Sequence, residues 1–362
     1  MTRLRQPVAT FLVSPAIVLA VAATLPAQAT VTVPCDRDNT MYANGSSLSN
    51  ATGEYLFSGR TASFGARRAL VHFDVAAAVP AGSTIRSAQL VLTMDRTQAL
   101  AFATTIHRVT ADWGEGTSKA TGAQGQGAQA TNGDATWADR FFGQSMPWTT
   151  QGGDVNTTPS ATTMVGTPAV YTFGSTTALV ADAQSFLDAP TSNFGWLIRT
   201  DESVTTAKRW HSRETVVSTN RPRLILTYDP PQASVTPFGT GCNDAQRRAL
   251  THGASGLPKI GNTSFAFTST NGVAATVAVH LLTVNVQNPP IPINTNNCFL
   301  YVDLATLLLT TPAIHDASGS ATLPFPIPNI ASLAGITFPT QIFELGGPAL
   351  RTSNGLTVKL GN

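Results

Sequence analysis

The chain of 362 residues is long enough for two or three domains, and 42% hydrophobic with only 12% charged residues excludes disorder driven by charge. The 29 glycines and 23 prolines favour many short strands joined by turns over a helical bundle. Arg3 and Arg5 account for the whole formal net charge of +2, because residues 1–29 contain no acidic residue. The rest of the chain has equal numbers of basic and acidic residues, which argues against nucleic acid, or an anionic membrane, as a partner bound mainly by charge.

Residues 1–29 have the parts of a secretory signal peptide. Arg3 and Arg5 precede the apolar residues 8–25, and the small-x-small sequence 27–29 follows, after which signal peptidase is expected to cleave. A retained membrane anchor is the alternative, because the apolar stretch is about long enough to span a bilayer. Prolines 15 and 26 favour cleavage. We expect a secreted or cell-surface protein with no membrane span after signal cleavage.

Period-two patterns predict strands across residues 30–229. Residues 88–94 and 223–228 alternate apolar and polar side chains, as strands do when one face lies on a core. Residues 69–73 and 195–198 are continuously apolar, which is typical of central strands. These patterns predict a β-sandwich as the first domain.

One segment of this domain has helical spacing instead. Leu179, Ala183 and Phe186 recur on one helical face between Ser175, a suitable N-cap, and Pro190. We therefore expect one short helix beside the sandwich. Residues 119–135, rich in Ala, Gly, Gln and Thr, contain nothing that could build a core, and we expect them to form a long exposed loop.

A proline-rich linker is predicted at residues 230–238, where three prolines interrupt a stretch without periodicity. Residues 239–362 are predicted to form a second all-β domain. Its strand candidates, separated by Asn, Pro and Gly, are residues 264–268, 275–281, 298–302 and 355–361. The expected fold class is all-β, with two β-sandwich domains joined by the linker.

The three cysteines would lie in an oxidising compartment after export. Cys242 and Cys298 both lie in the last third of the chain, and we expect them to form a disulfide. Cys35 is then left as a free thiol, and a Cys35–Cys242 bridge is the alternative.

Two charged residues of the first domain flank apolar strands. Arg68 and Glu214 would each be costly to bury alone, so we expect a structural ion pair between them rather than a catalytic carboxylate.

The tryptophans are candidates for a glycan site, because a flat indole can stack on the apolar face of a sugar ring. Trp196 and Trp210 lie in strand-like runs and are expected in the core. The candidate binding set is Trp113, Trp137 and Trp148, which lie in Gly-rich or polar contexts.

Signals for metals and catalysis are few. Asp36, Asp38 and Asn39 place three oxygen-bearing side chains close together, which makes structural calcium the one cofactor indicated. The loop glycine and distal glutamate of a helix-loop-helix calcium site are absent from this stretch, and a turn is favoured over a metal site.

The sequence contains no two-histidine zinc pattern, nucleophile elbow or phosphate-cradling loop. Asp112 and Glu115 could form a glycosidase pair only if the fold set their separation. We expect no enzymatic activity.

A set of phrases in the first domain has a specific order and spacing. They are RALVHFD at 68–74, PAGSTI at 80–85, SAQL at 87–90, RV at 108–109, DWGEG at 112–116, Trp148 with GGD at 152–154, NFGW at 193–196, SRE at 212–214 and RPRL at 221–224. This set resembles the secreted bacterial DNRLRE domain family, which is grouped with alginate-type carbohydrate-binding modules. The resemblance covers about residues 36–229 and implies a jelly-roll-like β-sandwich on an extracellular protein, with binding rather than catalysis as its function. The sequence departs from the commonest pattern after Glu115, where other members often have a short segment containing Thr and Trp.

The last 124 residues loosely resemble a small β-sandwich domain found at the C-terminus of secreted bacterial proteins. The likeness lies in the order of GC at 241–242, Pro258, GN at 261–262, NC at 297–298, LP at 323–324 and LAG at 333–335. Such a domain could display, anchor or tether the first.

The expected function is a secreted, non-catalytic protein whose first domain binds extracellular polysaccharide. A structural or adhesive cell-surface protein without a glycan ligand is the alternative, and a polysaccharide-degrading enzyme is the third hypothesis. Exposed, coplanar aromatic rings would favour glycan binding, and a cleft with two facing carboxylates would favour the enzyme. The sequence does not predict an oligomeric state.

Overall fold

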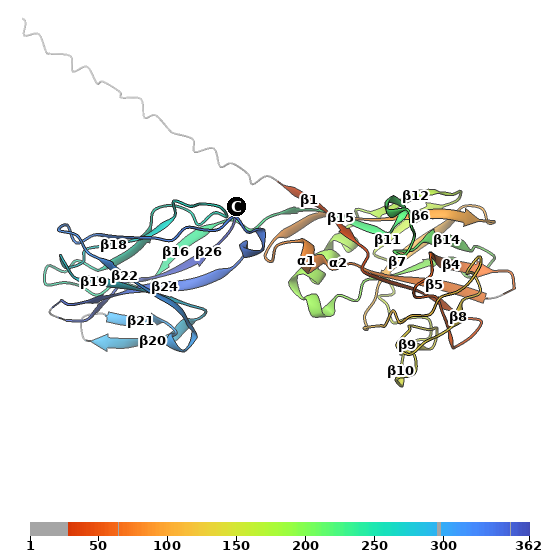
Figure 1. The fold of residues 1–362 in the computed structure, drawn as a ribbon, viewed down its shortest axis with the longest axis horizontal. Coiled ribbons are helices and arrows are strands. Elements are labelled where there is room, and N and C mark those ends of the chain that lie inside the picture. Colours follow the sequence, from red (N-terminus) through yellow and green to blue (C-terminus); the bar gives the residue numbers. More distant parts are fainter. Residues whose placement is uncertain (1–27, 64, 295–297, 348) are drawn as a thin grey trace, which may run out of the picture.

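The computed structural model describes residues 28–362 except 64, 295–297 and 348, so nearly all of the predicted signal peptide lies outside the described residues. Antiparallel sheets are the main regular structure of the described chain, which confirms the all-β prediction (Figure 1). None of the helices in this part of the chain is long and apolar enough to cross a membrane.

The first domain contains two antiparallel sheets that pack face to face. Its strands are β1 (Ala29–Pro34), β2 (Arg37–Tyr42), β3 (Leu48–Ser49), β4 (Tyr55–Thr61), β5 (Gly65–His72), β6 (Thr84–Thr97), β7 (Phe102–Arg108), β8 (Ala128–Gln129), β9 (Asp139–Phe141), β10 (Met146–Pro147), β11 (Ala161–Val165), β12 (Ala169–Gly174), β13 (Trp196–Thr200), β14 (Lys208–His211) and β15 (Arg223–Asp229). One sheet has the order β1-β15-β6-β14-β4, with β12 beside β6. The other has the order β2-β5-β13-β7-β11.

Strand β4 belongs to both sheets. Residues 55–58 pair with β14, and residues 59–61 pair with β5. The change of sheet occurs at Gly59, whose φ is 91° and where a Cβ atom would lie 2.6 Å from the Thr206 hydroxyl oxygen. Glycine is required here because its backbone must be left-handed and must also approach another segment closely.

The core between the two sheets is apolar and rich in aromatic rings. Trp196 and Trp210 are fully buried in it, as predicted, and both make edge contacts with phenylalanine rings. Leu90, Leu92 and Leu224 lie in the same core, from the two strands that alternate in sequence. The period-two pattern therefore identified the inward face correctly.

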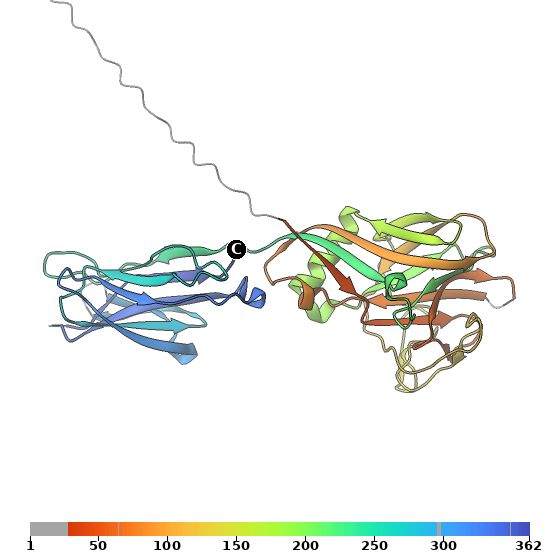
Figure 2. The same ribbon diagram turned by 45° about the horizontal axis from the view of Figure 1, so that its top comes forward.

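The outer face of the β5–β13 sheet is also buried. Leu70 and Leu197 point away from the main core and pack with Trp113 and Trp148. These tryptophans belong to residues 109–160, which we call the covering segment; Figure 2 shows it lying over this sheet in yellow. A strand that is buried on both faces must be continuously apolar, which explains the sequences of β5 and β13.

The prediction of a long exposed loop at residues 119–135 is therefore right in the loop and wrong in part about its exposure. Ala120, Gln124 and Ala135 are buried, and the Gln124 carbonyl accepts a hydrogen bond of 3.0 Å from the Tyr42 hydroxyl. Composition failed here because backbone groups and small side chains fix this loop, without any large apolar residue of its own.

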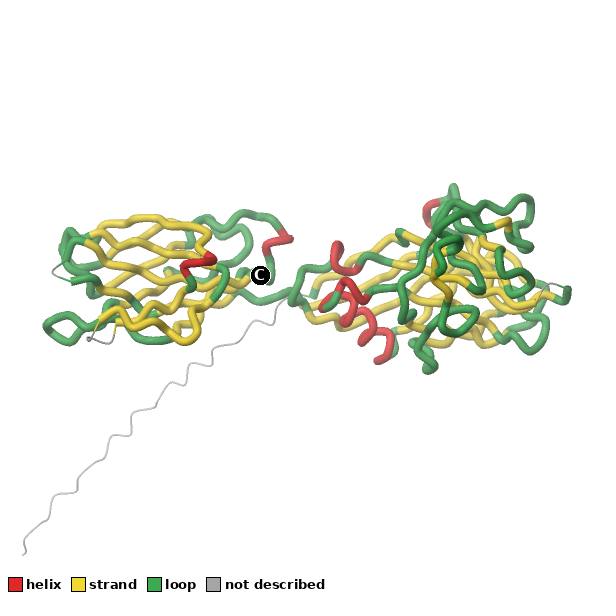
Figure 3. Tube along the Cα trace, turned by 90° about the horizontal axis from the view of Figure 1, so that it is seen from below, coloured by secondary structure: helices red, strands yellow, loops and turns green. Residues whose placement is uncertain are grey.

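The expected helix is α2 (Thr177–Asp188), which packs on the main core through Leu179, Ala183 and Phe186. Its N-cap is Thr176, whose hydroxyl accepts from the Leu179 amide, and not Ser175 as predicted. A second helix, α1 (Val75–Ala78), was not expected. Both helices lie at the end of the first domain that faces the second domain (Figure 3).

The second domain begins earlier than predicted. Its strands are β16 (Ser234–Phe238), β17 (Thr251–Ala254), β18 (Ala266–Thr270), β19 (Val277–Thr283), β20 (Val286–Asn294), β21 (Cys298–Val302), β22 (Leu307–Ile314), β23 (Ala321–Pro324), β24 (Thr337–Leu345), β25 (Arg351–Thr352) and β26 (Gly355–Lys359). Residues 234–238, predicted as linker, pair with β26 as a strand, so the link is reduced to residues 230–233. A proline inside an edge strand removes no needed donor, which is why Pro237 is tolerated in β16.

The central sheet of the second domain has the order β16-β26-β24-β19-β22. The β17–β18–β23 sheet packs on one face and supplies Ala254, Phe267 and Leu323 to the core, together with Phe265 just before β18. The β20–β21 hairpin packs Leu300 and Val302 on the other face. The disulfide Cys242–Cys298 joins the start of β21 to the segment before β17, as predicted. Cys35, half-buried beside β2, is a free thiol.

Two histidines are buried between β17 and β19. The rings of His252 and His280 lie 5.2 Å apart, and neither ring nitrogen of His280 has a hydrogen-bond partner. Burial lowers the pKa of His252 to about 3 and that of His280 to about 4, and in each case a neighbouring imidazole lowers the pKa further.

We therefore expect the second domain to lose stability as the pH falls below about 6.5, the ordinary histidine pKa. The unfolded chain binds protons that the folded domain excludes, so the stabilising contribution is complete above that pH and is lost towards the folded pKa values. Each histidine should lower the free energy of unfolding by about 2 kcal/mol between pH 7 and pH 5.

Urea unfolding of wild type and His280→Phe at both pH values checks this. Far-ultraviolet circular dichroism reports both domains, and fluorescence reports only the first, which holds all five tryptophans. An equal loss in both proteins would contradict the assignment, and His211→Gln in the first domain is the control.

Candidate functional site

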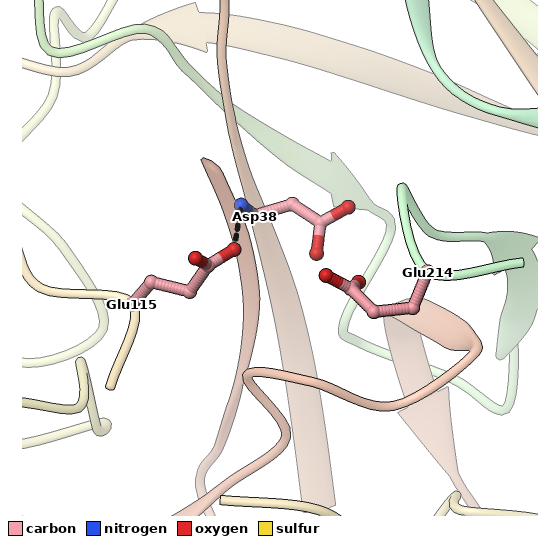
Figure 4. A group of neighbouring side chains, drawn as sticks. All are labelled: Asp38, Glu115 and Glu214. Carbon is pink, nitrogen blue, oxygen red and sulfur yellow. Dashed lines mark hydrogen bonds between the residues drawn. The ribbon is translucent and has the colours of Figure 1, made fainter. Parts of the chain in front are cut away.

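Three carboxylates from distant parts of the chain meet in the first domain. Asp38 lies on β2, Glu115 in the covering segment, and Glu214 in the turn after β14. One oxygen atom of each lies within 4.8 Å of the others, and Figure 4 shows the carboxylates of Asp38 and Glu214 pointing toward each other. We call these three residues the carboxylate cluster.

Arg213 organises the cluster. Its Nε and Nη2 atoms each donate to a different carboxylate oxygen of Glu115 at 2.7 Å, a bidentate pair. The same Nε lies 3.0 Å from Oε1 of Glu214, and the Arg213 backbone amide donates to Oδ2 of Asp38 at 2.7 Å. The Asp38 amide donates to Glu115 at 2.8 Å (Figure 4). The adjacent residues Arg213 and Glu214 of the sequence SRE therefore supply the cation of the cluster and one of its three carboxylates.

Burial dominates the electrostatics of the cluster. Asp38 is fully buried, and burial together with the charge of Glu214 raises the pKa of Asp38 well above its usual value. Burial also raises the pKa of Glu214, against the lowering effect of Arg213. Hydrogen bonds to Glu115 raise the pKa of Arg213, which keeps its charge.

The predicted ion pair between Arg68 and Glu214 is wrong. Arg68 instead makes a bidentate pair with Glu202, at 2.8 and 2.9 Å, and donates to the Gly152 carbonyl at 2.9 Å. Glu202 follows β13, the strand next to β5, whereas Glu214 follows β14 in the other sheet. The prediction that Arg68 has a buried carboxylate as its partner is confirmed. The strand order determines which carboxylate lies near it.

The candidate tryptophans do not form an exposed platform. Trp113 and Trp148 are buried, and their indole nitrogens donate to the carbonyls of Phe194 and Thr136. Trp137 is half-buried, and the Arg68 guanidinium lies 4.6 Å from its ring centre. The prediction of Trp113 and Trp148 as binding residues is therefore wrong, because they cover the outer face of the β5–β13 sheet.

Of the three candidate calcium ligands in β1–β2, only Asp38 meets other carboxylates. Asp36 pairs with His72, with Oδ1 and Nδ1 2.7 Å apart. The Asn39 side chain is used in hydrogen bonds to the Glu115 carbonyl and the Ser49 hydroxyl. Composition indicated an oxygen-rich site at this position, but its other members lie 77 and 176 residues further along, and local spacing could not reveal them.

Asp112 and Glu115, the glycosidase pair considered from sequence, are each paired with a different arginine. Asp112 is paired with Arg37 at 3.2 Å, and Glu115 is paired with Arg213. The carboxylates that do face each other, Asp38 and Glu214, have oxygen atoms within 4.8 Å, well below the roughly 6.5 to 9.5 Å between the carboxyl groups of an inverting glycosidase. Asp38 has no exposed surface through which a substrate could reach it.

A second feature is a groove at the end of the sandwich. It consists of two adjoining hollows of about 240 and 520 Å³ that share Thr61, Ala62, Ala123 and Gly125. The β4–β5 turn, the β6–β7 turn, residues 205–209 and the covering segment form its walls. Its polar side chains include Thr61, Ser63, Thr97, Gln98, Thr121, Gln126 and Thr205.

The groove carries positive charge. Arg96, Lys208 and Arg209 line it, and none of the described residues that line it is acidic. Arg209 is paired with Asp95 at 2.8 Å, and the buried Lys208 ammonium donates to Thr97 and to the Leu100 carbonyl. Arg96 is exposed and makes no ion pair with any residue that the structure describes.

The groove wall is held in place by buried hydrogen bonds. Oε1 of Gln124 accepts from the Tyr55 amide at 3.1 Å and from the Asn50 side chain at 3.3 Å. Arg67 donates to the Gly125 carbonyl at 2.8 and 2.9 Å. The loop is therefore ordered before any ligand binds, which lowers the entropic cost of binding.

No family model matches the chain, and no curated protein matches it. Among solved structures, a β-glucuronidase of Parabacteroides merdae with glycerol in its active site is similar at 6% identity with a TM-score of 0.16. The match covers 81% of this chain and 27% of that one, so this chain spans about a quarter of the enzyme's length. A likeness this low carries no argument about fold or function.

The observed partner of Arg68 can be tested with double-mutant cycles. We expect Arg68→Met and Glu202→Gln to be coupled by about 1 to 3 kcal/mol in unfolding free energy, because both groups are largely buried and share two hydrogen bonds. The cycle of Arg68→Met with Glu214→Gln should give a coupling below about 0.5 kcal/mol. Chemical unfolding followed by tryptophan fluorescence measures both coupling energies. A larger coupling of Arg68 to Glu214 than to Glu202 would contradict the observed pair and support the pair predicted from sequence.

Proposed function

We propose that this is a secreted, non-catalytic protein whose first domain binds an acidic extracellular polysaccharide in the groove. The observation that carries the proposal is the groove lining, in which hydroxyl and amide side chains surround an exposed arginine, with no acidic residue among them. Hydroxyls and amides suit the many hydroxyl groups of a sugar chain. The guanidinium suits a carboxylate or sulfate ester on it.

Other features support secretion and binding without catalysis. The apolar N-terminal stretch with its small-x-small site is typical of export, and the Cys242–Cys298 disulfide fits an oxidising compartment. The carboxylates of the cluster are engaged with Arg213 or buried, which leaves no accessible acid and base pair there. The resemblance to the DNRLRE family adds an expectation of glycan binding, although the groove uses the segment in which this chain departs from that family.

The alternative, an adhesive surface protein, draws support from the second domain. Strand β22 is at the edge of its sheet and exposes apolar side chains, with Leu308 62% and Ile314 69% exposed. An exposed apolar edge strand can pair with another chain. Under this alternative the first domain would be a spacer, and the groove would bind no polymer.

Binding to immobilised polysaccharides tests the proposal. Residues 30–362 should be retained on polyuronates such as alginate more strongly than on neutral polymers, and retention should fall with added salt. Arg96→Ala should weaken binding about tenfold, because a charged hydrogen bond is lost. Arg86→Ala is the matched control, since Arg86 is an exposed arginine at the other end of the same strand. Failure of every polymer to retain the protein saturably, or equal binding by Arg96→Ala, would contradict the proposal and favour the adhesive alternative.

A further inference from the structure

The charges of the carboxylate cluster do not cancel. Arg213 is the only cation in contact with Asp38, Glu115 and Glu214 among the residues that the structure describes. Three ionised carboxylates and one guanidinium leave an excess of two negative charges in a site that is largely closed to water. Such an excess is costly at low dielectric unless protons or a metal ion neutralise it.

Two oxygen atoms of the cluster are buried without any hydrogen-bond partner. They are Oδ1 of Asp38, a residue with no exposed surface, and Oε2 of Glu214. Figure 4 shows that these two carboxylates are directed at each other. Buried carboxylate oxygens nearly always have a partner, so unpartnered oxygens on two carboxylates that point toward each other indicate a proton or an ion bound by them.

The donors identify the class of ion. All three ligating groups are carboxylates, and no histidine or cysteine belongs to the cluster. Hard cations such as Ca²⁺ take oxygen ligands of this kind, whereas zinc favours nitrogen and sulfur. The two excess negative charges match one divalent ion.

We propose that the carboxylate cluster binds a divalent cation of the calcium type, with Asp38 and Glu214 as its main protein ligands and Glu115 as a third. The cation ties β2, the covering segment and the turn after β14 together. Its function is to stabilise the first domain. The proposal is independent of polysaccharide binding, because none of the three carboxylates lines the groove.

Calcium binding by the mature chain, residues 30–362, tests the proposal directly. After treatment with a chelator, wild type should bind one Ca²⁺ per chain in a calorimetric titration, more tightly than Mg²⁺. The midpoint of thermal unfolding of the first domain, followed by tryptophan fluorescence, should rise by about 5 to 10 °C when the Ca²⁺ concentration is a hundredfold above the dissociation constant. Asp38→Asn and Glu214→Gln should each lose the binding and the thermal shift.

The control is Asp36→Asn, which removes a neighbouring carboxylate that is paired with His72 outside the cluster. It should bind Ca²⁺ as wild type does. Near-ultraviolet circular dichroism checks that each variant is folded, and Glu214→Gln serves if Asp38→Asn does not fold. Absence of binding and of a thermal shift in wild type, with Asp38→Asn at least as stable as wild type, would overturn the proposal. A proton shared by the two carboxylates would then explain the arrangement. Loss of binding in Asp36→Asn alone would also overturn the assignment.

Discussion

The bidentate pair between Arg213 and Glu115 joins parts of the first domain that are nearly a hundred residues apart. Arg213 follows β14 of one sheet, and Glu115 belongs to the covering segment. Asp38 in the other sheet bonds to both, because its backbone amide donates to Glu115 and its carboxylate accepts from the Arg213 backbone amide. The covering segment forms few strand pairings of its own, so side-chain and backbone contacts must fix it. The Arg213–Glu115 pair acts with the buried Trp113 and the Arg37–Asp112 pair to hold the first part of the segment against the sandwich.

The groove depends on that attachment. The Ala120 amide donates to the Asn50 side chain just before the groove wall at residues 121–127, and within the wall the Gln124 carbonyl accepts from the Tyr42 hydroxyl. A wall held in this way can present hydroxyl and amide groups in fixed positions. The carboxylate cluster itself does not line the groove, and Glu115 is linked to the groove wall only through the segment that runs from it to residue 121.

The strands were predictable because their signal is local. Alternation in β6 and β15, and the continuous apolar runs of β5 and β13, follow from which faces are buried, and each pattern can be read within a few residues. The helix was found for the same reason. Its cap was misplaced by one residue because Ser175 and Thr176 are both good caps, and the Ser175 hydroxyl instead accepts from the Ala88 amide.

The candidate site was harder to predict, because it depends on which segments the topology brings together. Arg68 needs a buried carboxylate, but only the strand order shows that Glu202 is nearer than Glu214. The tryptophans in Gly-rich contexts seemed exposed, yet Trp113 and Trp148 fill a second core that composition did not indicate. Local sequence can identify the residues that need partners, and the fold determines the partners.

Hydrogen exchange in Glu115→Gln tests the central claim, that the Arg213–Glu115 pair holds the covering segment in place. The account predicts that amides of residues 117–135 exchange at least about tenfold faster than in wild type, while amides of β6 and β15 keep their protection, because the sandwich core is separate from this contact. Asp112→Asn, which breaks a neighbouring and more exposed ion pair, should leave exchange in the segment unchanged. Wild-type protection of residues 117–135 in Glu115→Gln would contradict the account.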